Sequence, residues 1–308
     1  MAYISVIIPL YNKENFIENT LKSVLDQGFN DFEVIIVNDG STDKSEDKIK
    51  HFDDVRIKYF SQENQGVSVA RNFGISKANS NFITFIDADD YWYPEFLQEM
   101  FQTINENSDQ KVFSAAIEVE TARKIFQAQY SVDKTKQLQI VNYFDASSKT
   151  TVICTSCAVF HKSIFDEVGN FDSQIKSGQD TDLWIRMGLV YQVVFLNKIL
   201  ARYVFDEKSL SKEKMNRNEK LNFDKFLEIE KSNLKLKKYL DLNRYSLAIK
   251  SKMNNDISSF KYFTENINLE NLSIKKRILL QQPAIILKTL IAFNLQLVKL
   301  GLSHSVFK

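Results

Sequence analysis

The chain has 308 residues, of which 44% are hydrophobic and 26% charged, and its formal net charge is +1. This length allows one large domain or two smaller ones, and the composition is ordinary for a soluble globular protein. Because the charge is nearly balanced, no basic field points to nucleic acid, and we expect no nucleic-acid partner. The apolar run at residues 5–10 is too short for a signal peptide and lacks a basic start, so we expect a cytoplasmic protein.

The two cysteines, Cys154 and Cys157, form a C-x-x-C pair. Without a second pair of cysteines, this spacing does not indicate a zinc site. Redox motifs of the thioredoxin type open a helix, whereas this pair lies inside a predicted strand at residues 151–160. We interpret both residues as buried structural cysteines that stay reduced.

The first hundred or so residues alternate between predicted strands and helices. Short apolar runs between polar residues predict strands at 4–10, 32–37, 55–60 and 82–86. A helix is predicted after each strand, from apolar residues at helical spacing, from a capping box at Asp43 and Glu46, and from Pro94 at a first helical position. Four such alternations indicate an α/β fold with a doubly wound, mainly parallel sheet.

Polar clusters follow the first, second and fourth predicted strands. They consist of Tyr11 and Asn12, of Asp39, and of residues 87–90. Ligands of doubly wound sheets bind beyond the carboxyl ends of the strands. We therefore expect the three clusters to face one crevice.

Three carboxylates, Asp87, Asp89 and Asp90, stand within four residues at the end of the fourth predicted strand. Carboxylates this close repel one another, and a divalent cation with oxygen ligands offsets that cost most directly. The alternative is a polar loop that leads into the helix after Pro94. The four residues by themselves leave both interpretations open.

From residue 112 the pattern is less regular. It predicts strands at 112–119, 151–160 and 193–204, a short helix at 163–168 ended by Gly169, and a further helix capped by Asp180 or Thr181. Residues 205–218 are polar and rich in lysine, which predicts a mobile loop. Strand signals stop after residue 218. We therefore divide the chain into an α/β domain at 1–218 and a helical C-terminal appendix at 219–308.

The appendix ends in a basic, amphipathic segment. Lys275, Lys276 and Arg277 precede residues 285–300, whose polar and apolar side chains fall largely on opposite faces of a helix. This pattern suits a helix at a membrane interface, and the segment is too short and interrupted for a spanning helix. Packing on the protein's own body or on a second subunit is the alternative. A peripheral contact with the inner face of the cell membrane and a homodimer through these helices both stay open.

Five short motifs resemble those of family-2 glycosyltransferases with the GT-A fold. They occur in the family's order: SVIIPLYN at 5–12, VNDGSTD at 37–43, NQG with ARNFG at 64–74, IDADD at 86–90 and GQDTDLW at 178–184. Each motif alone is weak, but five in order are specific. The resemblance covers about residues 4–211 and leaves out the appendix. It implies a GT-A type sheet and an inverting transferase that depends on a nucleotide sugar.

The resemblance also implies a donor site. Pro9, Tyr11, Asp39 and Arg71 correspond to nucleotide-binding residues, usually for uridine diphosphate (UDP). An aromatic face can stack on a base, a carboxylate can accept an imide N–H, and an arginine can donate to a carbonyl oxygen. The alternatives are a strand-end core residue for Tyr11, a turn former for Asp39 and a surface residue for Arg71.

Residues 87–89 resemble the D-x-D signature of this family. The resemblance implies that Asp89 ligates Mn²⁺ or Mg²⁺, while Asp87 holds the ribose or shares the metal. Such an ion would bridge the diphosphate and neutralise the charge that builds on the leaving nucleotide.

Asp180 corresponds to the family's catalytic base, which takes a proton from the attacking acceptor hydroxyl. Asp182 is the second candidate, and a helix cap is the structural alternative for Asp180. Three positions depart from the family pattern. Gln179 stands where glutamate is usual. Val204 and Asp206 stand where many relatives have an arginine and a histidine, and in some relatives the histidine helps to hold the metal or the phosphates. Asp206 could replace that histidine as an oxygen ligand, or the contact is absent.

The expected function is transfer of a sugar from a nucleotide sugar, with UDP as the expected nucleotide, to a saccharide or lipid-linked acceptor. The expected setting is the assembly of bacterial-type surface polysaccharides or glycans. A non-catalytic protein that binds nucleotide sugars or glycans on the same fold is the alternative. A nucleotide-dependent oxidoreductase is disfavoured because no G-x-G-x-x-G follows the first strand.

Overall fold

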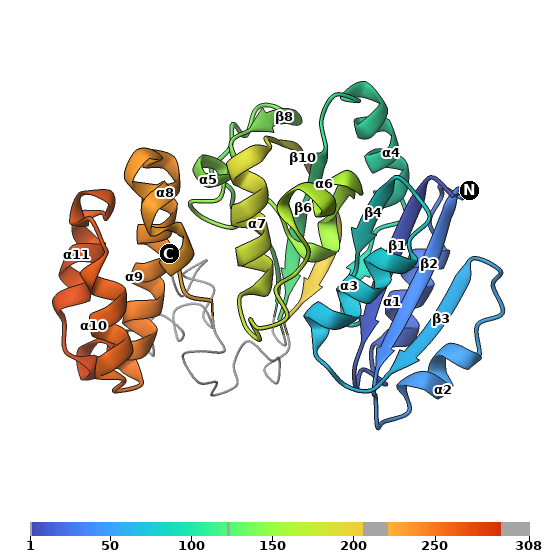
Figure 1. Cartoon of the computed structure of the whole chain (residues 1–308), viewed down its shortest axis with the longest axis horizontal. Coiled ribbons are helices and arrows are strands. Elements are labelled where there is room, and N and C mark those ends of the chain that lie inside the picture. The colour runs from blue at the N-terminus through green and yellow to red at the C-terminus, as the bar shows by residue number, and fades with distance from the viewer. Residues whose placement is uncertain (1, 122–123, 206–220, 291–308) are drawn as a thin grey trace. The chain divides into compact units, whose positions relative to one another are not determined.

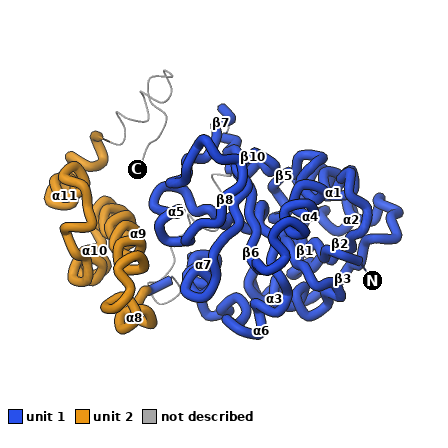
Figure 2. Tube along the Cα trace, turned by 90° about the horizontal axis from the view of Figure 1, so that it is seen from above, with its two compact units in different colours: residues 1–222 blue, residues 223–308 orange. Residues whose placement is uncertain are grey.

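A computed structural model describes residues 2–121, 124–205 and 221–290 (Figure 1). The chain divides into two compact units, Met1–Asn222 and Phe223–Lys308, which are coloured separately in Figure 2. The boundary predicted between residues 218 and 219 lies outside the described residues, as does almost all of the predicted loop at 205–218.

Unit 1 is built on one mixed sheet, and the described residues contribute ten strands to it. The strand order is β3-β2-β1-β4-β9-β6-β10-β5, with β7 beside β6 and β8 beside β10. Strands β3, β2, β1 and β4 run parallel, as do β6 and β10, whereas β9 is antiparallel to both of its neighbours. The prediction of a mainly parallel α/β sheet is confirmed. The strands are β1 (Ile4–Leu10), β2 (Phe32–Asp39), β3 (Ile57–Gln62), β4 (Phe82–Phe85), β5 (Tyr91–Trp92), β6 (Val112–Glu120), β7 (Ile125–Gln127), β8 (Leu138–Val141), β9 (Ala158–His161) and β10 (Val193–Val204).

Helices cover both faces of this sheet, which explains why every residue of β1 and β2 is buried. In Figure 1, α3, α6 and α7 lie in front of the sheet and α1 lies behind it. On β1, Val6 and Ile8 belong to the same apolar cluster as the buried residues of α1. Ile7 points the other way, toward α3, where a Cβ on Gly74 would come within 2.5 Å of the Ile7 side chain. The helices of unit 1 are α1 (Ile17–Leu25), α2 (Ser45–Lys50), α3 (Val67–Lys77), α4 (Phe96–Glu106), α5 (Tyr143–Ala146), α6 (Ser163–Val168) and α7 (Gln179–Val190).

The strand predicted at residues 151–160 is wrong in its first part. Only Ala158–His161 form β9, and Thr155–Cys157 form a turn of 3₁₀ helix. Side chains satisfy the backbone there instead of a strand neighbour: Ser114 Oγ donates to the Val152 carbonyl at 2.5 Å, and Trp92 Nε1 donates to the Ser156 carbonyl at 2.6 Å. Both cysteines of this stretch are free thiols, with Cys157 buried and Cys154 half-buried.

The predicted cap of α7 is also wrong. The N-cap is Gly178 with φ of 90°, a backbone conformation that glycine adopts without strain, and Asp180 is the second residue of the helix. The helix predicted from Asp43 begins slightly later, at Ser45, whose backbone N–H donates to Asp43 Oδ1 at 2.9 Å.

Unit 2 is helical throughout its described residues, so the prediction of C-terminal helices is confirmed. Residues packed in its small apolar core include Ile249 from α9, Phe263 from α10 and Leu280 from α11. None of the described helices of the chain is long and apolar enough to span a bilayer. The helices are α8 (Leu227–Ser232), α9 (Leu234–Met253), α10 (Ile257–Glu265) and α11 (Ile274–Gln281), with short 3₁₀ turns at Asp224–Phe226 and Leu269–Asn271.

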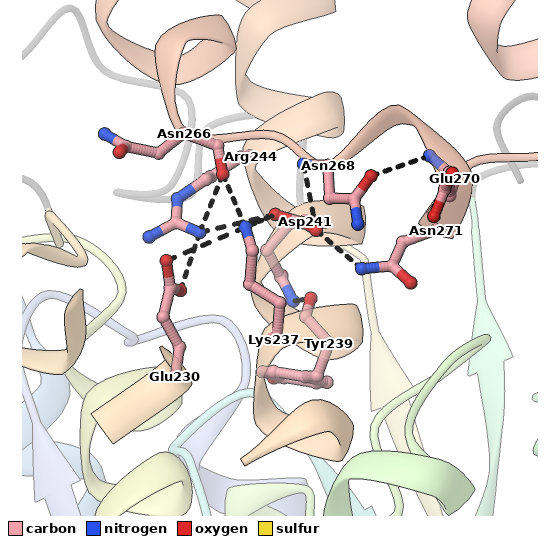
Figure 3. A network of polar contacts seen from close by, with 10 residues as sticks. Glu230, Lys237, Tyr239, Asp241, Arg244, Asn266, Asn268, Glu270 and Asn271 are labelled. Carbon is pink, nitrogen blue, oxygen red and sulfur yellow. Dashed lines mark hydrogen bonds and ion pairs between the residues drawn. The ribbon is translucent and has the colours of Figure 1, made fainter. Parts of the chain in front are cut away.

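A buried polar network ties α8 and α9 to the turn that follows α10 (Figure 3). Asp241 is fully buried, and its Oδ1 lies 2.6 Å from Lys237 Nζ. Asp241 Oδ2 accepts from Asn271 Nδ2 at 2.8 Å. Arg244, also buried, pairs with Glu230 at 2.7 Å. Charged groups removed from water in this way have to find partners, and here they find one another.

Candidate active site

The loops after β1, β2 and β4 meet at the carboxyl edge of the sheet. Asn12 Oδ1 accepts from the Thr42 backbone N–H at 2.8 Å, which joins the first two loops. Lys13 Nζ lies 2.6 Å from Asp89 Oδ2, which joins the first loop to the third. The structure therefore brings the three polar clusters together, as strand topology predicts.

Arg71 of α3 lies between two carboxylates. Its Nη2 donates to Asp87 Oδ1 and its Nη1 to Asp180 Oδ1, both at 2.6 Å. The side chain is only 2% exposed, and its guanidinium lies 5.2 Å from the centre of the Phe171 ring. Burial alone would lower the pKa of Arg71, but the two carboxylates raise it above the usual value, so the group stays charged. One fixed cation thus connects residues 87 and 180.

Asp180 lies in the first turn of α7 and its side chain is 36% exposed, so an acceptor from solvent can reach it. Partial burial raises the pKa of its carboxyl, Arg71 opposes that rise, and the charge of Asp87 adds to it. A carboxylate in this position also gains from the helix N-terminus. A raised pKa makes a carboxylate a stronger base.

Asp182, the second candidate for the base, lies in a different environment. Its side chain is completely buried, and its Oδ2 accepts from Arg186 Nε at 3.0 Å within the same helix. Arg186 in turn donates to backbone carbonyls, among them that of Asn170 at 2.8 Å. This arrangement is typical of a structural ion pair and gives an acceptor no access. Trp184, 2% exposed and stacked on Phe160 at 5.0 Å, lies in the core.

Two buried polar atoms near Asp180 have no hydrogen-bond partner among the described residues. They are Nε of Arg71 and Oε1 of Gln179. Buried polar atoms without a partner are uncommon in folded proteins, and a bound ligand or water is one way to satisfy them. One of the two atoms belongs to the side chain that bonds to Asp180, and the other to the residue before Asp180 in the chain.

Asp89 is 15% exposed and lies beside Asp87 in sequence and in space. Burial and the charge of Asp87 raise the pKa of the Asp89 carboxyl, while Lys13 lowers it. Asp89 also lines a cleft of about 610 Å³, together with Asn15 and Asn19 of the α1 side and Arg202 at the end of β10. A ligand in that cleft can reach the Asp89 carboxylate.

Asp90, the third carboxylate of the cluster, is a structural residue. It is buried, its Oδ2 accepts from Ser156 Oγ at 2.5 Å, and its Oδ1 accepts from the Val204 backbone N–H at 2.9 Å. Burial and the charges of Asp87 and Asp89 raise the pKa of the Asp90 carboxyl well above its usual value. Asp90 holds the loop after β4 against the end of β10, a role that the sequence pattern does not reveal.

The remaining predicted donor residues lie near the ends of β1 and β2. Tyr11 is 43% exposed, so its ring is available for stacking. Asp39 is buried and accepts from Gln62 Nε2 at 2.7 Å and from the backbone N–H groups of Gln65 and Gly66 at 3.0 and 2.8 Å. A carboxylate offers about four acceptor positions, and these bonds take three of them. Pro9 is a buried residue of β1 opposite Val37.

Asp87 and Asp89 fit a metal ion that takes its remaining ligands from a bound substrate. No group of three or more histidine, cysteine, aspartate or glutamate side chains within the described part of the chain could hold a metal ion. Asp87 and Asp89 offer two carboxylates, and Mg²⁺ at nucleotide sites is usually held by one or two carboxylates with the substrate's phosphates. Burial and the neighbouring charge of Asp87 raise the pKa of the Asp89 carboxyl, and a cation beside the two carboxylates offsets both effects. Asp206 lies outside the described residues.

Comparisons with known proteins find the same fold and family. The crystal structure of S. aureus TarS 1–349 in complex with UDP-GlcNAc superposes with a TM-score of 0.63 and 18% sequence identity. The match covers 85% of this chain and 90% of the TarS chain. Glycosyltransferase GlyA of Streptococcus pneumoniae serotype 4 is 30% identical over 68% of this chain and 31% of its own length. The putative glycosyltransferase EpsH of Bacillus subtilis is 36% identical over 46% of this chain and 43% of its own.

The chain thus aligns with less than half the length of these two curated relatives. Residues 5–169, more than half of the chain, match the model of glycosyl transferase family 2. That range contains the contact between Arg71 and Asp87 and four of the five motifs. The chain therefore belongs to glycosyl transferase family 2, as its motifs predict, and has that family's GT-A fold.

Proposed function

We propose that the chain is an inverting glycosyltransferase that moves a sugar from a UDP-sugar to a hydroxyl of a saccharide or lipid-linked acceptor. The observation that carries the proposal is the Arg71 bridge, because it holds a donor-side carboxylate, Asp87, and a solvent-accessible carboxylate, Asp180, on one guanidinium. TarS, whose crystal structures contain UDP or UDP-GlcNAc, supports a nucleotide-sugar donor. The setting we propose is surface polysaccharide or glycan assembly.

Asp87 and Asp89 are the residues that would hold Mn²⁺ or Mg²⁺. When bound, the ion supplies positive charge to the diphosphate that leaves with the nucleotide. Tyr11 stacks on the base, while the remaining acceptor position of Asp39 takes an imide N–H. Arg71 keeps Asp87 and Asp180 at a fixed separation and adds positive charge between them.

The chemical step uses Asp180 as the base. Its carboxylate accepts the proton of the acceptor hydroxyl while the hydroxyl oxygen forms a bond to the anomeric carbon. The bond from that carbon to the diphosphate oxygen breaks at the same time, and UDP leaves with the bonding electrons. Attack opposite the leaving group inverts the anomeric configuration. The test is a screen of nucleotide sugars and acceptors for release of UDP. The anomeric configuration of the new linkage is then determined in the product. No transfer with any donor would contradict the proposal.

UDP is expected to bind at least about tenfold more tightly with Mn²⁺ or Mg²⁺ than with a chelator, a coupling of ordinary size between two ligands. The reason is that a metal between Asp89 and the diphosphate offsets charge on both. Asp89→Ala should abolish the difference. Calorimetric titration of UDP measures it, and Asp26→Ala is the control, since Asp26 lines the same cleft outside the D-x-D motif. Equal UDP affinity with metal and with chelator would contradict the metal site.

The second part of the proposal is a contact with an anionic membrane surface. It would be made by exposed apolar side chains of α11 and of the residues that follow it. Ile274, Ile278 and Ile285 are 75%, 53% and 74% exposed. Lys275 and Lys288 are basic neighbours of these residues. Apolar side chains beside basic ones are typical of interfacial helices. Residues 291–300 of the predicted amphipathic segment lie outside the described residues.

The full chain is expected to float with anionic liposomes at low salt and to lose that binding when Ile274, Ile278 and Ile285 are all replaced by Gln. These side chains are exposed, so the replacement should leave the fold intact. Ile257→Gln is the control, because Ile257 is 80% exposed on α10 of the same unit. Flotation that is absent in the wild type, or unchanged in the triple variant, would exclude this face. A wild-type dimer that dissociates in the triple variant would assign the face to a second copy.

A further inference from the structure

Both carboxylates of the D-x-D motif already have a basic partner in the structure. Asp87 bonds to Arg71, and Asp89 lies 2.6 Å from Lys13 Nζ. The Lys13–Asp89 pair is partly buried, with side-chain exposures of 24% and 15%. A charge pair with little water around it attracts more strongly than an exposed one. Lys13 therefore occupies the neighbourhood that a divalent ion on Asp89 would need.

The two basic residues differ in their freedom to move. Arg71 is 2% exposed and is held by two carboxylates and an aromatic ring. Lys13 is fixed at its backbone, whose N–H donates to the buried Ser45 Oγ at 2.8 Å, but its ammonium is carried on a flexible four-carbon stem. Its Nζ also lies 5.5 Å from the centre of the Phe16 ring. Of the two partners, Lys13 is the one that can give way to another cation.

We infer that Lys13 is the resident cation of Asp89 and makes the binding of a divalent ion and of a nucleoside diphosphate depend on each other. Arg71 and Lys13 already neutralise the charges of the two carboxylates. A divalent ion that binds alone must therefore displace the Lys13 ammonium, so its net gain in binding free energy is small. A diphosphate brings new negative charge, which both cations can then share. This inference rests on the metal-dependent donor site of the proposed function.

The test is the affinity for Mn²⁺ alone, measured on the full chain from the electron paramagnetic resonance signal of free Mn²⁺, with and without UDP. Wild-type protein should bind Mn²⁺ weakly, and UDP should raise that affinity. Lys13→Met keeps the apolar stem beside Phe16 and removes the charge. It should bind Mn²⁺ without UDP about tenfold more tightly, and the effect of UDP should shrink by a similar factor, because no ammonium then has to be displaced before UDP binds. Mn²⁺ should change the UDP affinity by the same smaller factor, since coupling between two ligands is reciprocal.

Two control variants separate this role from a general loss of charge or of fold. Lys13→Arg keeps the positive charge and should not gain affinity for Mn²⁺ in the absence of UDP. Lys22→Met removes an exposed positive charge that lines the same cleft and should change Mn²⁺ affinity less than about threefold, because solvent screens it. If Lys13→Met binds Mn²⁺ no more tightly than Lys22→Met does, the inference is wrong while the donor site stands. If UDP binds to every protein but Mn²⁺ to none, the metal site itself fails, and this inference with it.

Discussion

Asp180→Asn is expected to lower sugar transfer by about 10²–10⁴-fold, the usual worth of general-base catalysis. The acceptor hydroxyl loses its proton only as the new bond forms, so the carboxylate matters in the transition state and much less in the donor complex. Asn keeps the size of Asp, and its Oδ1 can still accept from Arg71 Nη1, which lies 2.6 Å from Asp180 Oδ1. The fold and the UDP dissociation constant should therefore change little. The measurement is the transfer rate of the variant beside its UDP affinity.

Asp166→Asn is the control for this prediction, because it removes an exposed carboxylate from α6 of the same unit. Its transfer rate should match that of the wild type. Asp182→Asn tests the alternative base. Because Asp182 is fully buried and paired with Arg186, we expect this variant to lose stability while each folded molecule keeps its activity. Transfer by Asp180→Asn at nearly the wild-type rate would show that the base is another residue.

The strands of the parallel half could be predicted from sequence because each is buried on both faces. In β1 and β2 every residue is buried and most are apolar, so each strand stands out as a short apolar run between polar segments. The segment before β9 could not be predicted in the same way. Its residues are also buried, but Ser114 and Trp92 satisfy its backbone through side chains. Buried irregular backbone and buried strand look alike in a single sequence.

The candidate site could be predicted as a set of residues but not as a set of contacts. The order of the motifs identifies Arg71, Asp87 and Asp180. Nothing in the sequence indicates that one guanidinium bonds to both carboxylates, one of which is 109 residues away in the chain. Lys13 carries no signal at all, since a lysine in a polar loop is normally solvated. Its ion pair with Asp89 depends on how the loops after β1 and β4 meet, and only the fold decides that.

The polar network of unit 2 is likewise invisible in the sequence. Lys237, Asp241 and Arg244 follow one another at helical spacing, a pattern that usually indicates a solvated helix face. In the structure, Asp241 and Arg244 are buried instead, and Glu230 of α8 and Asn271 of the turn after α10 complete their bonds. The same charges thus serve as the polar part of a core in which apolar residues are few.

Asp241→Asn is expected to destabilise unit 2 by about 3–5 kcal/mol, the usual cost of breaking a buried ion pair by removing one partner. Asp241 is fully buried, and its carboxylate bonds to Lys237 Nζ at 2.6 Å and to Asn271 Nδ2 at 2.8 Å. A neutral amide leaves two basic side chains, Lys237 and Arg244, with Glu230 as their remaining charged partner in the network (Figure 3). Removing water from an unbalanced positive charge is costly, and Arg244, which is 3% exposed, cannot reach solvent without opening the helices, whereas Lys237 is 20% exposed.

Hydrogen exchange of the α9 amides measures this loss in unit 2 by itself, because protection there reports local as well as global opening. Glu265→Gln is the matched control. It breaks an ion pair with Lys261 at the same i,i+4 spacing as Lys237 and Asp241, but on the exposed face of α10, where the two side chains are 57% and 78% exposed. An exposed pair of this kind contributes about 0.5 kcal/mol or less, so α9 protection should hardly change. If Asp241→Asn lowers the α9 opening free energy no more than Glu265→Gln does, the network does not hold the unit together, and its apolar core must do so alone.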